Sequence, residues 1–178
     1  FEFDSQPGYQ KMNKENKLIP GLPPGFEDRW NKKLILKKKL INIIENNFIK
    51  FGFEPLETPS FEISENIGSF LADDDSNPMS DVFSFKDGEK NITLRYDLSS
   101  PLARFIAQNN QELPLPYKRY AIQNVFRNEK AGNARYREFT QADCDIVGNV
   151  NPAQANAELC NLIASTLLAC GLKKDQFV

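Results

Sequence analysis

The sequence predicts an α+β fold in which an antiparallel β-sheet is flanked by helices. Residues near 81–98 and 118–147 alternate between polar and apolar side chains and are broken by short turns, which is typical of strands joined by hairpins. Residues 28–50 and 151–171 carry apolar side chains at three- and four-residue spacing, which is typical of helices. The sequence contains neither a phosphate loop nor a Rossmann glycine pattern, which disfavours the parallel nucleotide-binding folds.

The first element that we expect is a long helix. Residues 1–19 are polar and lack a hydrophobic period, so they predict a flexible tail. Residues 21–30, GLPPGFEDRW, predict a loop. The helix is expected at 28–50 and ends at Gly52. Its apolar stripe consists of Trp30, Leu34, Ile41, Ile44, Phe48 and Phe51.

Strands and a second helix are expected next. Residues 51–62, FGFEPLETPSFE, predict one strand interrupted by two prolines, which belongs at a sheet edge, a bulge or a subunit boundary because proline cannot donate to a ladder. Residues 64–81 predict a loop, and 81–98 a hairpin around KDGEK. A helix follows to about residue 108, capped by Ser99 and Ser100.

The last elements are two strands and a helix. The strands are expected at about 118–128 and 135–147, on either side of the turn NEKAGNA. The helix begins near Asn151 and Pro152 and ends at Gly171. With 178 residues, the chain is long enough for one domain with a sizeable core.

Composition excludes several classes of function. The net charge of −2 argues against a generally basic surface that coats nucleic acid, although a local basic pocket stays compatible with it. The chain contains no histidine, so serine–histidine and cysteine–histidine hydrolase schemes are excluded within it. The three cysteines lack metal-binding spacing and favour a reducing compartment. We find no membrane-spanning run or signal-peptide core and expect a cytoplasmic protein.

Period-two alternation gives three of the predicted strands one polar face each. Either the wet side of a one-sided sheet or the floor of a nucleotide site accounts for such a face. The polar faces consist of Arg135, Arg137, Phe139, Gln141, Asp143 and Asp145; of Arg119, Gln123, Arg127 and Glu129; and of Thr93, Arg95, Asp97 and Ser99.

Two details favour a nucleotide site. The face is rich in arginine, whose rigid fork matches phosphate oxygens. Phe139 lies among polar residues, as a stacking platform for a base or as a ring partly buried under a loop. The arginines cluster near the turn, where an anion would bind, whereas Asp97 and Asp145 lie farther away, where a cationic group would bind or where they pair with the arginines.

Three segments together resemble the class II aminoacyl-tRNA synthetases, specifically the histidyl-tRNA synthetases. GFEPLETPSFE resembles motif 1, the dimer-forming segment, with its proline at Pro59. FRNEKAGNARYREF resembles motif 2, the strand–loop–strand that binds ATP. LRYDLSSPLARF resembles the histidine-binding segment in its alphaproteobacterial form. The resemblance covers about residues 20 to 175 and implies the class II catalytic fold.

The resemblance implies a set of roles. Arg127 would grip the α-phosphate of ATP and act in catalysis, and Glu129 would contact the adenine end. Arg135 and Arg137 would hold the β- and γ-phosphates or line the loop, and Phe139 would stack on adenine. The residues implied for histidine are Asp97, Ser99 and Gln141 at its α-ammonium group and Asp145 at its imidazole ring. For Ser99, helix capping is an equal alternative.

The implied reaction is the ATP- and Mg²⁺-dependent activation of L-histidine and its transfer to tRNA(His) by a homodimer. No motif 3, no later active-site arginine and no anticodon-binding domain is found in the sequence. Residues 20–178 would therefore be the N-terminal part of an incomplete catalytic domain, inactive alone. Asp97 and Asp145 stand where family members often carry glutamate. A regulatory subunit of ATP phosphoribosyltransferase and an RNA-sensing module are alternatives; the intact FRNE and RYREF segments disfavour the first, and the acidic chain disfavours the second.

Overall fold

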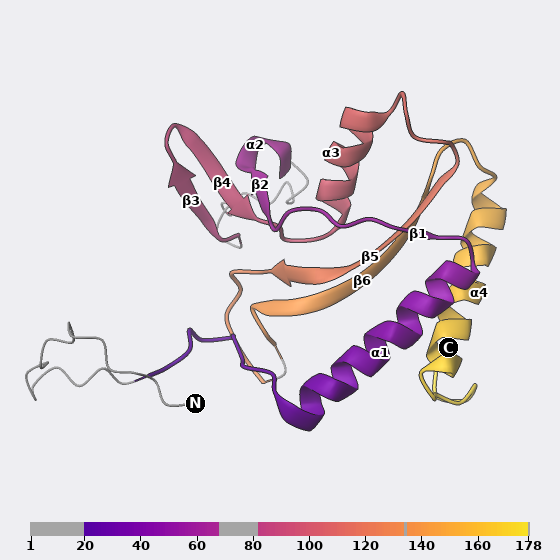
Figure 1. Ribbon diagram of the computed structural model, residues 1–178, viewed down its shortest axis with the longest axis horizontal. Coiled ribbons are helices and arrows are strands. Elements are labelled where there is room, and N and C mark those ends of the chain that lie inside the picture. The colour runs from indigo at the N-terminus through magenta and orange to yellow at the C-terminus, as the bar shows by residue number, and fades with distance from the viewer. Residues whose placement is uncertain (1–19, 68–81, 134, 178) are drawn as a thin grey trace, which may run out of the picture.

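The computed structural model describes residues 20–67, 82–133 and 135–177, so the predicted tail at 1–19 lies outside the described residues. Two β-sheets and four helices make up this part of the chain, and most strand pairs are antiparallel, which confirms the predicted α+β class (Figure 1). Within the described ranges no helix is long and apolar enough to cross a membrane.

The larger sheet has the strand order β1-β5-β6. β5 (Tyr117–Phe126) and β6 (Glu138–Val147) form a long antiparallel hairpin in which ten residue pairs face each other. Arg119 lies opposite Asp145, and Gln123 lies opposite Gln141. The edge strand β1 (Glu54–Pro55) pairs with β5 in parallel, so this sheet is mixed.

The smaller sheet is antiparallel throughout and has the order β2-β4-β3. β3 (Ser84–Asp87) and β4 (Lys90–Leu94) form the predicted hairpin, and Gly88 provides the left-handed backbone that its tight turn requires (φ 61°). β2 (Phe61–Ile63) pairs with the other side of β4.

The prediction of a single strand at 51–62 is wrong. The chain forms β1, crosses from one sheet to the other over residues 56–60, and then forms β2. Side chains take the place of ladder partners in the crossing segment, since the Thr58 backbone N–H donates to Gln123 Oε1 at 3.2 Å. The expectation that proline confines this segment to a sheet edge is confirmed for β1.

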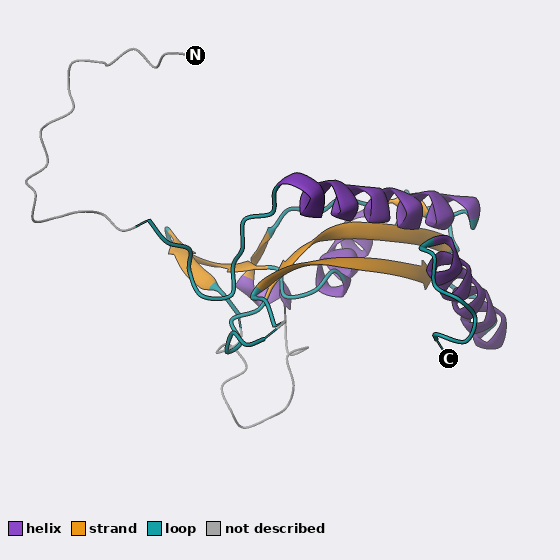
Figure 2. Cartoon of the chain, turned by 90° about the horizontal axis from the view of Figure 1, so that it is seen from below, coloured by secondary structure: helices purple, strands orange, loops and turns teal. Residues whose placement is uncertain are grey.

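Two helices cover one face of the larger sheet. α1 (Asn31–Lys50) and α4 (Pro152–Ala169) contact each other, and Figure 2 shows α1 running along the long strands. α4 begins at Pro152 as predicted, and Asn151 caps it. The core between these elements is built from Phe48, Phe53, Tyr120 and Leu162, with Ile44, Phe51, Ile122, Cys144, Ile146 and Leu159 packed against it.

The predicted start and stripe of the first helix need correction. α1 begins at Asn31, because Trp30 is extended (φ −145°, ψ 168°), and the Trp30 side chain is 71% exposed. Arg29 is held outside the helix by its ion pair with Glu27 and by a hydrogen bond from Nη2 to the Glu138 carbonyl oxygen. The 21–30 segment therefore lies against the sheet as a loop.

The other side of the β5–β6 hairpin faces α3 (Ser99–Asn109) and the smaller sheet (Figure 1). Leu98, Ala121 and Val125 form a second buried cluster there, and Phe139 packs against it. The N-cap residue of α3 is Leu98 rather than Ser99 or Ser100, and the side chain that caps the first turn is that of Asp97, whose Oδ1 accepts from the Ser100 backbone N–H at 2.9 Å. The predicted loop at 64–81 begins with a short helix, α2 (Ser64–Ile67), and its remainder lies outside the described residues.

Candidate functional site

The loop between β5 and β6 surrounds a cavity of about 400 Å³. Four of the five residues that the sequence implied for ATP line this cavity, and Tyr136 joins them. The lining residues are Arg127, Glu129, Arg135, Tyr136 and Phe139. The structure therefore brings most of the implied nucleotide residues together at one end of the hairpin.

Arg127 is held by aromatic rings. Its guanidinium carbon lies 4.4 Å from the centroid of the Tyr96 ring and 5.1 Å from that of Phe139. Arg127 Nε also donates to the Tyr96 carbonyl oxygen at 3.4 Å. No carboxylate of the described residues forms an ion pair with Arg127. The result is an oriented cation at the cavity whose charge is left for a ligand.

Phe139 is a partly buried ring. One part packs against the Leu98, Ala121 and Val125 cluster, and the guanidinium group of Arg127 lies over its ring. The Phe139 ring is thus partly buried, as one of its two alternatives expected, and it also lines the cavity.

Glu129 and Arg135 pair with each other. Arg135 Nη2 forms an ion pair with Glu129 Oε2, and Tyr96 Oη donates to Glu129 Oε1 at 3.2 Å. Glu129, which the sequence placed in the turn, therefore pairs with one of the arginines there. The Arg135 side chain is 64% exposed, so this pair contributes little to stability and opens readily to a ligand.

Arg137 is directed away from the cavity. Its Nη2 donates to Asn128 Oδ1, and its guanidinium carbon lies 4.8 Å from the centroid of the Phe83 ring. Its backbone N–H donates to the Gly25 carbonyl oxygen at 2.8 Å. Gly25 has a φ of +84°, and a Cβ there would lie 2.5 Å from Arg137 Cγ. The 21–30 loop thus packs against Arg137 and fixes it.

The predicted strand at 135–147 starts too early, because β6 begins at Glu138. Arg135 and Arg137 lie in the loop and do not follow strand alternation. The same reason explains why alternation assigned Tyr136 to the opposite side from the cavity residues, although it lines the cavity.

The far end of the hairpin is polar and acidic. Gln141, Asp143 and Asp145 follow one another on the face of β6 that also carries Phe139. Asp145 Oδ2 lies 2.9 Å from Arg119 Nη2. Burial raises the pKa of Asp143; Arg119 opposes this rise, and the charges of Asp145 and Asp97 add to it.

The other residues implied for histidine lie on β6 or just before α3. Gln141 Oε1 is buried and has no hydrogen-bond partner within the described residues, so it is an unused acceptor. Asp97 Oδ1 is occupied by the cap of α3, and Ser99 is exposed in the first turn of that helix. The helix-capping alternative for Ser99 is wrong, since Asp97 makes the cap.

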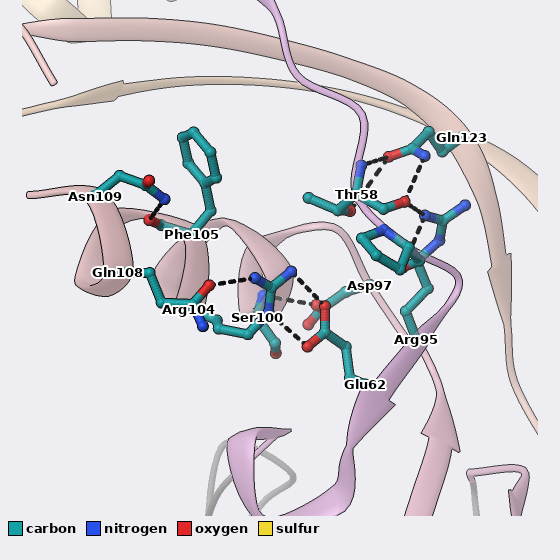
Figure 3. A network of polar contacts seen from close by, with 11 residues as sticks. Thr58, Glu62, Arg95, Asp97, Ser100, Arg104, Phe105, Gln108, Asn109 and Gln123 are labelled. Carbon is teal, nitrogen blue, oxygen red and sulfur yellow. Dashed lines mark hydrogen bonds and ion pairs between the residues drawn. The ribbon is translucent and has the colours of Figure 1, made fainter. Parts of the chain in front are cut away.

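The polar side predicted for 92–95 is buried, not solvent-exposed. Thr93 is 0% exposed and its hydroxyl bonds Ser64 Oγ at 2.6 Å, while Arg95 is 4% exposed. Arg95 Nε donates to the Asn124 carbonyl oxygen at 2.6 Å. Arg95 Nη1 donates to the carbonyl oxygens of Thr58 at 2.7 Å and Pro59 at 3.3 Å, and Figure 3 shows Arg95 directed toward Thr58. Arg95 therefore fastens the two sheets together and does not face the site.

Two contributors to the site were missed by the sequence reasoning. Tyr96 holds Arg127 and Glu129, and Tyr136 lines the cavity. Both fell on the face assigned as apolar. A tyrosine on the apolar side of a strand next to an arginine-rich loop is a weak signal that could have drawn attention to them.

Comparison with known proteins gives a consistent family. The family model described as Histidyl-tRNA synthetase matches residues 25–178. The histidine–tRNA ligase of Pelagibacter ubique (strain HTCC1062) is 90% identical over 167 residues, which cover 94% of this chain and 36% of that protein. The histidine–tRNA ligase of Rhodopseudomonas palustris (strain BisB18) is 42% identical over 95% of this chain and 32% of its own length. The chain thus spans about a third of the length of these relatives.

Solved structures share the fold. The histidyl-tRNA synthetase from Nostoc sp. PCC 7120 superposes with a TM-score of 0.70 at 26% identity, over 84% of this chain and 34% of that one. A Bacillus halodurans protein described as an ATP phosphoribosyltransferase regulatory subunit/histidyl-tRNA synthetase superposes with a TM-score of 0.75 at 24% identity, over 89% and 40% of the two chains. The second likeness concerns the fold alone.

Proposed function

The chain belongs to the histidyl-tRNA synthetase family, and on that premise we propose that the protein carrying it activates L-histidine with ATP and transfers it to tRNA(His). The observation that carries the proposal is the geometry of Arg127, an oriented arginine at a cavity that no described carboxylate neutralises. A planar guanidinium group held in this way is suited to a phosphate group.

In the proposed reaction the histidine carboxylate attacks the α-phosphorus of ATP in line. A carboxylate–phosphorus bond forms, the bond to pyrophosphate breaks, and the negative charge that develops on the phosphoryl oxygens is stabilised by Arg127. Such a reaction depends on position and charge and requires no acid–base residue. The absence of histidine from the chain is therefore compatible with it.

The remaining nucleotide residues have supporting roles in the proposal. Phe139 offers a ring for adenine, and Glu129 contacts the adenine end. Arg135 opens its exposed ion pair to meet the β- and γ-phosphates. Arg137, fixed by Gly25 and Phe83, supports the loop rather than the phosphates, which is one of the two roles that the resemblance offered.

The histidine end of the proposed site is the acidic end of the hairpin. The unused acceptor Gln141 Oε1, together with Asp97 and Ser99, receives the α-ammonium group, and Asp145 faces the imidazole ring. ATP would lie toward the loop and histidine toward Asp145, along one face of β6.

Mg²⁺ enters the proposal as a companion of ATP. Within the described ranges, no three His, Cys, Asp or Glu side chains form a group that could hold a metal ion. The ion would therefore be carried by the phosphate oxygens and would neutralise charge on the leaving pyrophosphate.

We also propose a cytoplasmic homodimer joined through the motif 1 segment around Pro59. Pro59 is exposed, and the neighbouring α1 exposes large apolar side chains that include Ile35 at 56%, Leu36 at 67% and Leu40 at 45%. Exposed apolar side chains gathered along one element favour an interface. Sedimentation of Leu36→Lys, with Lys39→Gln as a surface control, tests this: a dimeric variant would contradict the proposal.

The activity is tested by histidine-dependent ATP–pyrophosphate exchange on the full-length protein. We expect exchange in the wild type and a loss of at least about 100-fold in Arg127→Ala, the size found when a preorganised charge-stabilising donor is removed. Histidine binding without exchange would instead support the regulatory-subunit alternative. Retained exchange in Arg127→Ala would contradict the role of this residue.

A further inference from the structure

Arg119 lies at the centre of the histidine end and has no role in the reaction as described so far. It is on β5 directly opposite Asp145, and its side chain is 0% exposed. Arg119 Nη2 donates to the Leu98 carbonyl oxygen at 2.9 Å and lies 2.9 Å from Asp145 Oδ2. One nitrogen atom thus links the start of α3 to the acidic end of β6.

Two of the three Arg119 nitrogens have no partner. Nε and Nη1 are buried without a hydrogen bond within the described residues. A buried donor that is left unpaired is costly, and natural proteins rarely keep one without a function. A fully buried guanidinium group with two unused donors is therefore a poor stabiliser of this hairpin, because an apolar side chain would fill the same place at lower cost.

Asp145 is arranged to present its carboxylate to a ligand. Its Oδ2 is buried beside Arg119 and makes no hydrogen bond to any described residue, whereas the Asp145 side chain as a whole is 34% exposed. The buried oxygen is thus turned toward the cation, and the accessible part of the carboxylate faces outward. Gln141 on the same face contributes another unused atom, its buried Oε1.

We propose that Arg119 is the positioning residue of the amino-acid end of the site: it holds Asp145 by Oδ2, so that Oδ1 accepts the imidazole N–H of histidine. This inference rests on the proposed function. The charge of Arg119 also opposes the effect that the charges of Asp145 and Asp97 have on the neighbouring carboxyl group of Asp143. Its effect is confined to histidine, since the cavity that takes ATP lies at the other end of the hairpin.

The test is the kinetics of Arg119→Met on the full-length protein, with KM for histidine and for ATP measured separately. We expect the KM for histidine to rise roughly tenfold or more, as when one oriented charged contact is lost, while the KM for ATP stays within about twofold. Arg119→Lys keeps the charge but not the fork, so it should recover part of the loss.

Lys118→Met is the matched control. Lys118 is the preceding residue of β5, points to the opposite face and forms an ion pair with Glu158 of α4. It should leave both KM values within about twofold of the wild type. Equal KM values for histidine in Arg119→Met and in the wild type would overturn the inference, as would equal increases for histidine and ATP.

A double-mutant comparison separates positioning from folding. Asp145→Asn alone should raise the KM for histidine, and Arg119→Lys added to it should raise it no further, because the group that Arg119 positions is already lost. Full additivity would overturn the inference, and this arm serves if Arg119→Met does not fold. Calorimetric titration of histidine measures the effect of Arg119 on histidine binding without catalysis. A wild type that binds histidine but lacks ATP–pyrophosphate exchange would therefore refute the proposed function and leave the inference about Arg119 standing.

Discussion

Two arginines are buried in the described part of this molecule, and they differ in what their nitrogens contact. Arg95 and Arg119 are 4% and 0% exposed; Arg119 is part of β5, and Arg95 donates to a backbone carbonyl oxygen of the same strand. Arg95 uses its donors on three backbone carbonyl oxygens, whereas Arg119 uses one nitrogen and leaves two unpaired. Arg95 cross-links the two sheets and leaves no buried nitrogen unpaired within the described residues, whereas Arg119 has two buried nitrogens without a partner there.

The difference teaches how to separate scaffold from site. Burial alone does not distinguish the two arginines, and neither does residue type. Within the described residues, what distinguishes them is the number of unused donors and the partly exposed carboxylate of Asp145 beside Arg119. Buried polar groups whose donors are paired fix geometry, whereas a buried group with unpaired donors beside a partly exposed carboxylate indicates a functional site.

The largest expected effect comes from Arg95→Met. It removes the donors that hold the Thr58, Pro59 and Asn124 carbonyl oxygens, each worth about 1–3 kcal/mol when left unsatisfied, so we expect the free energy of unfolding to fall by more than about 3 kcal/mol. Urea denaturation followed by circular dichroism measures it.

Arg119→Met is the comparison for that measurement. It removes one hydrogen bond and one ion pair, so its loss of stability should be smaller by about 1.5 kcal/mol or more. Equal losses in the two variants would break the distinction between a saturated and an unsaturated arginine.

Gly25→Ala tests whether Arg137 belongs to the scaffold. A Cβ at φ +84° is strained and would lie 2.5 Å from Arg137 Cγ and 2.7 Å from its Cδ, so we expect a loss of about 1–3 kcal/mol. The Arg137 amide, which donates to the Gly25 carbonyl oxygen, should exchange faster with deuterium.

Gly21→Ala is the matched control, because no atom lies within 4 Å of a Cβ built there. If Gly25→Ala and Gly21→Ala change stability equally, Arg137 is not held in place by its contact with the 21–30 loop.

Asp143→Asn tests the acidic residues near Arg119 through the pH dependence of stability. The raised pKa of Asp143, caused first by burial, means that the folded state binds this proton more tightly than the unfolded state does. The ionised carboxylate therefore opposes folding, and the asparagine variant should have a higher Tm at neutral pH.

This gain should shrink as the pH falls through the folded-state pKa and vanish below the ordinary pKa of an aspartate, at about 3.9. Melting curves across this range measure it. A gain that does not change with pH would show that Asp143 is not the group responsible.

The smallest effect concerns the opposite face of β6. Burial, followed by the charges of Asp145 and Asp143, raises the pKa of the Cys144 thiol to about 11. Almost none of it is ionised at pH 8, so Cys144 should react with a thiol reagent far more slowly than the exposed Cys160. Labelling followed by peptide mass analysis checks the order, and equal rates would place Cys144 outside the core.

Sequence reasoning succeeded where the backbone is regular. Alternation placed Gln141 and Asp145 on one face of β6 and Arg119 and Gln123 on one face of β5, and the register confirms it. Residues that are two apart on a strand share a face whatever surrounds them, so this part of the site follows from local geometry.

Sequence reasoning failed where contacts with distant parts of the chain determine the position of a residue. Arg135 and Tyr136 lie in a loop without a period, and their positions depend on the contacts of that loop. Arg95 was assigned to a polar surface but is buried, because the crossing segment at Thr58 covers it. No local sequence pattern predicts that a distant segment will cover a residue.

The crossing segment at 56–60 also bears on the order of folding. The hairpin that carries both ends of the proposed site joins neighbouring strands, whereas Thr58 must find Gln123 across 65 residues of chain. Loop closure is costlier over that distance, so we expect the hairpin to form first and β1 to dock late. A nascent chain would then expose the bare edge of β5, where intermolecular strand pairing competes, until β1, which is synthesised before the hairpin, docks and covers that edge.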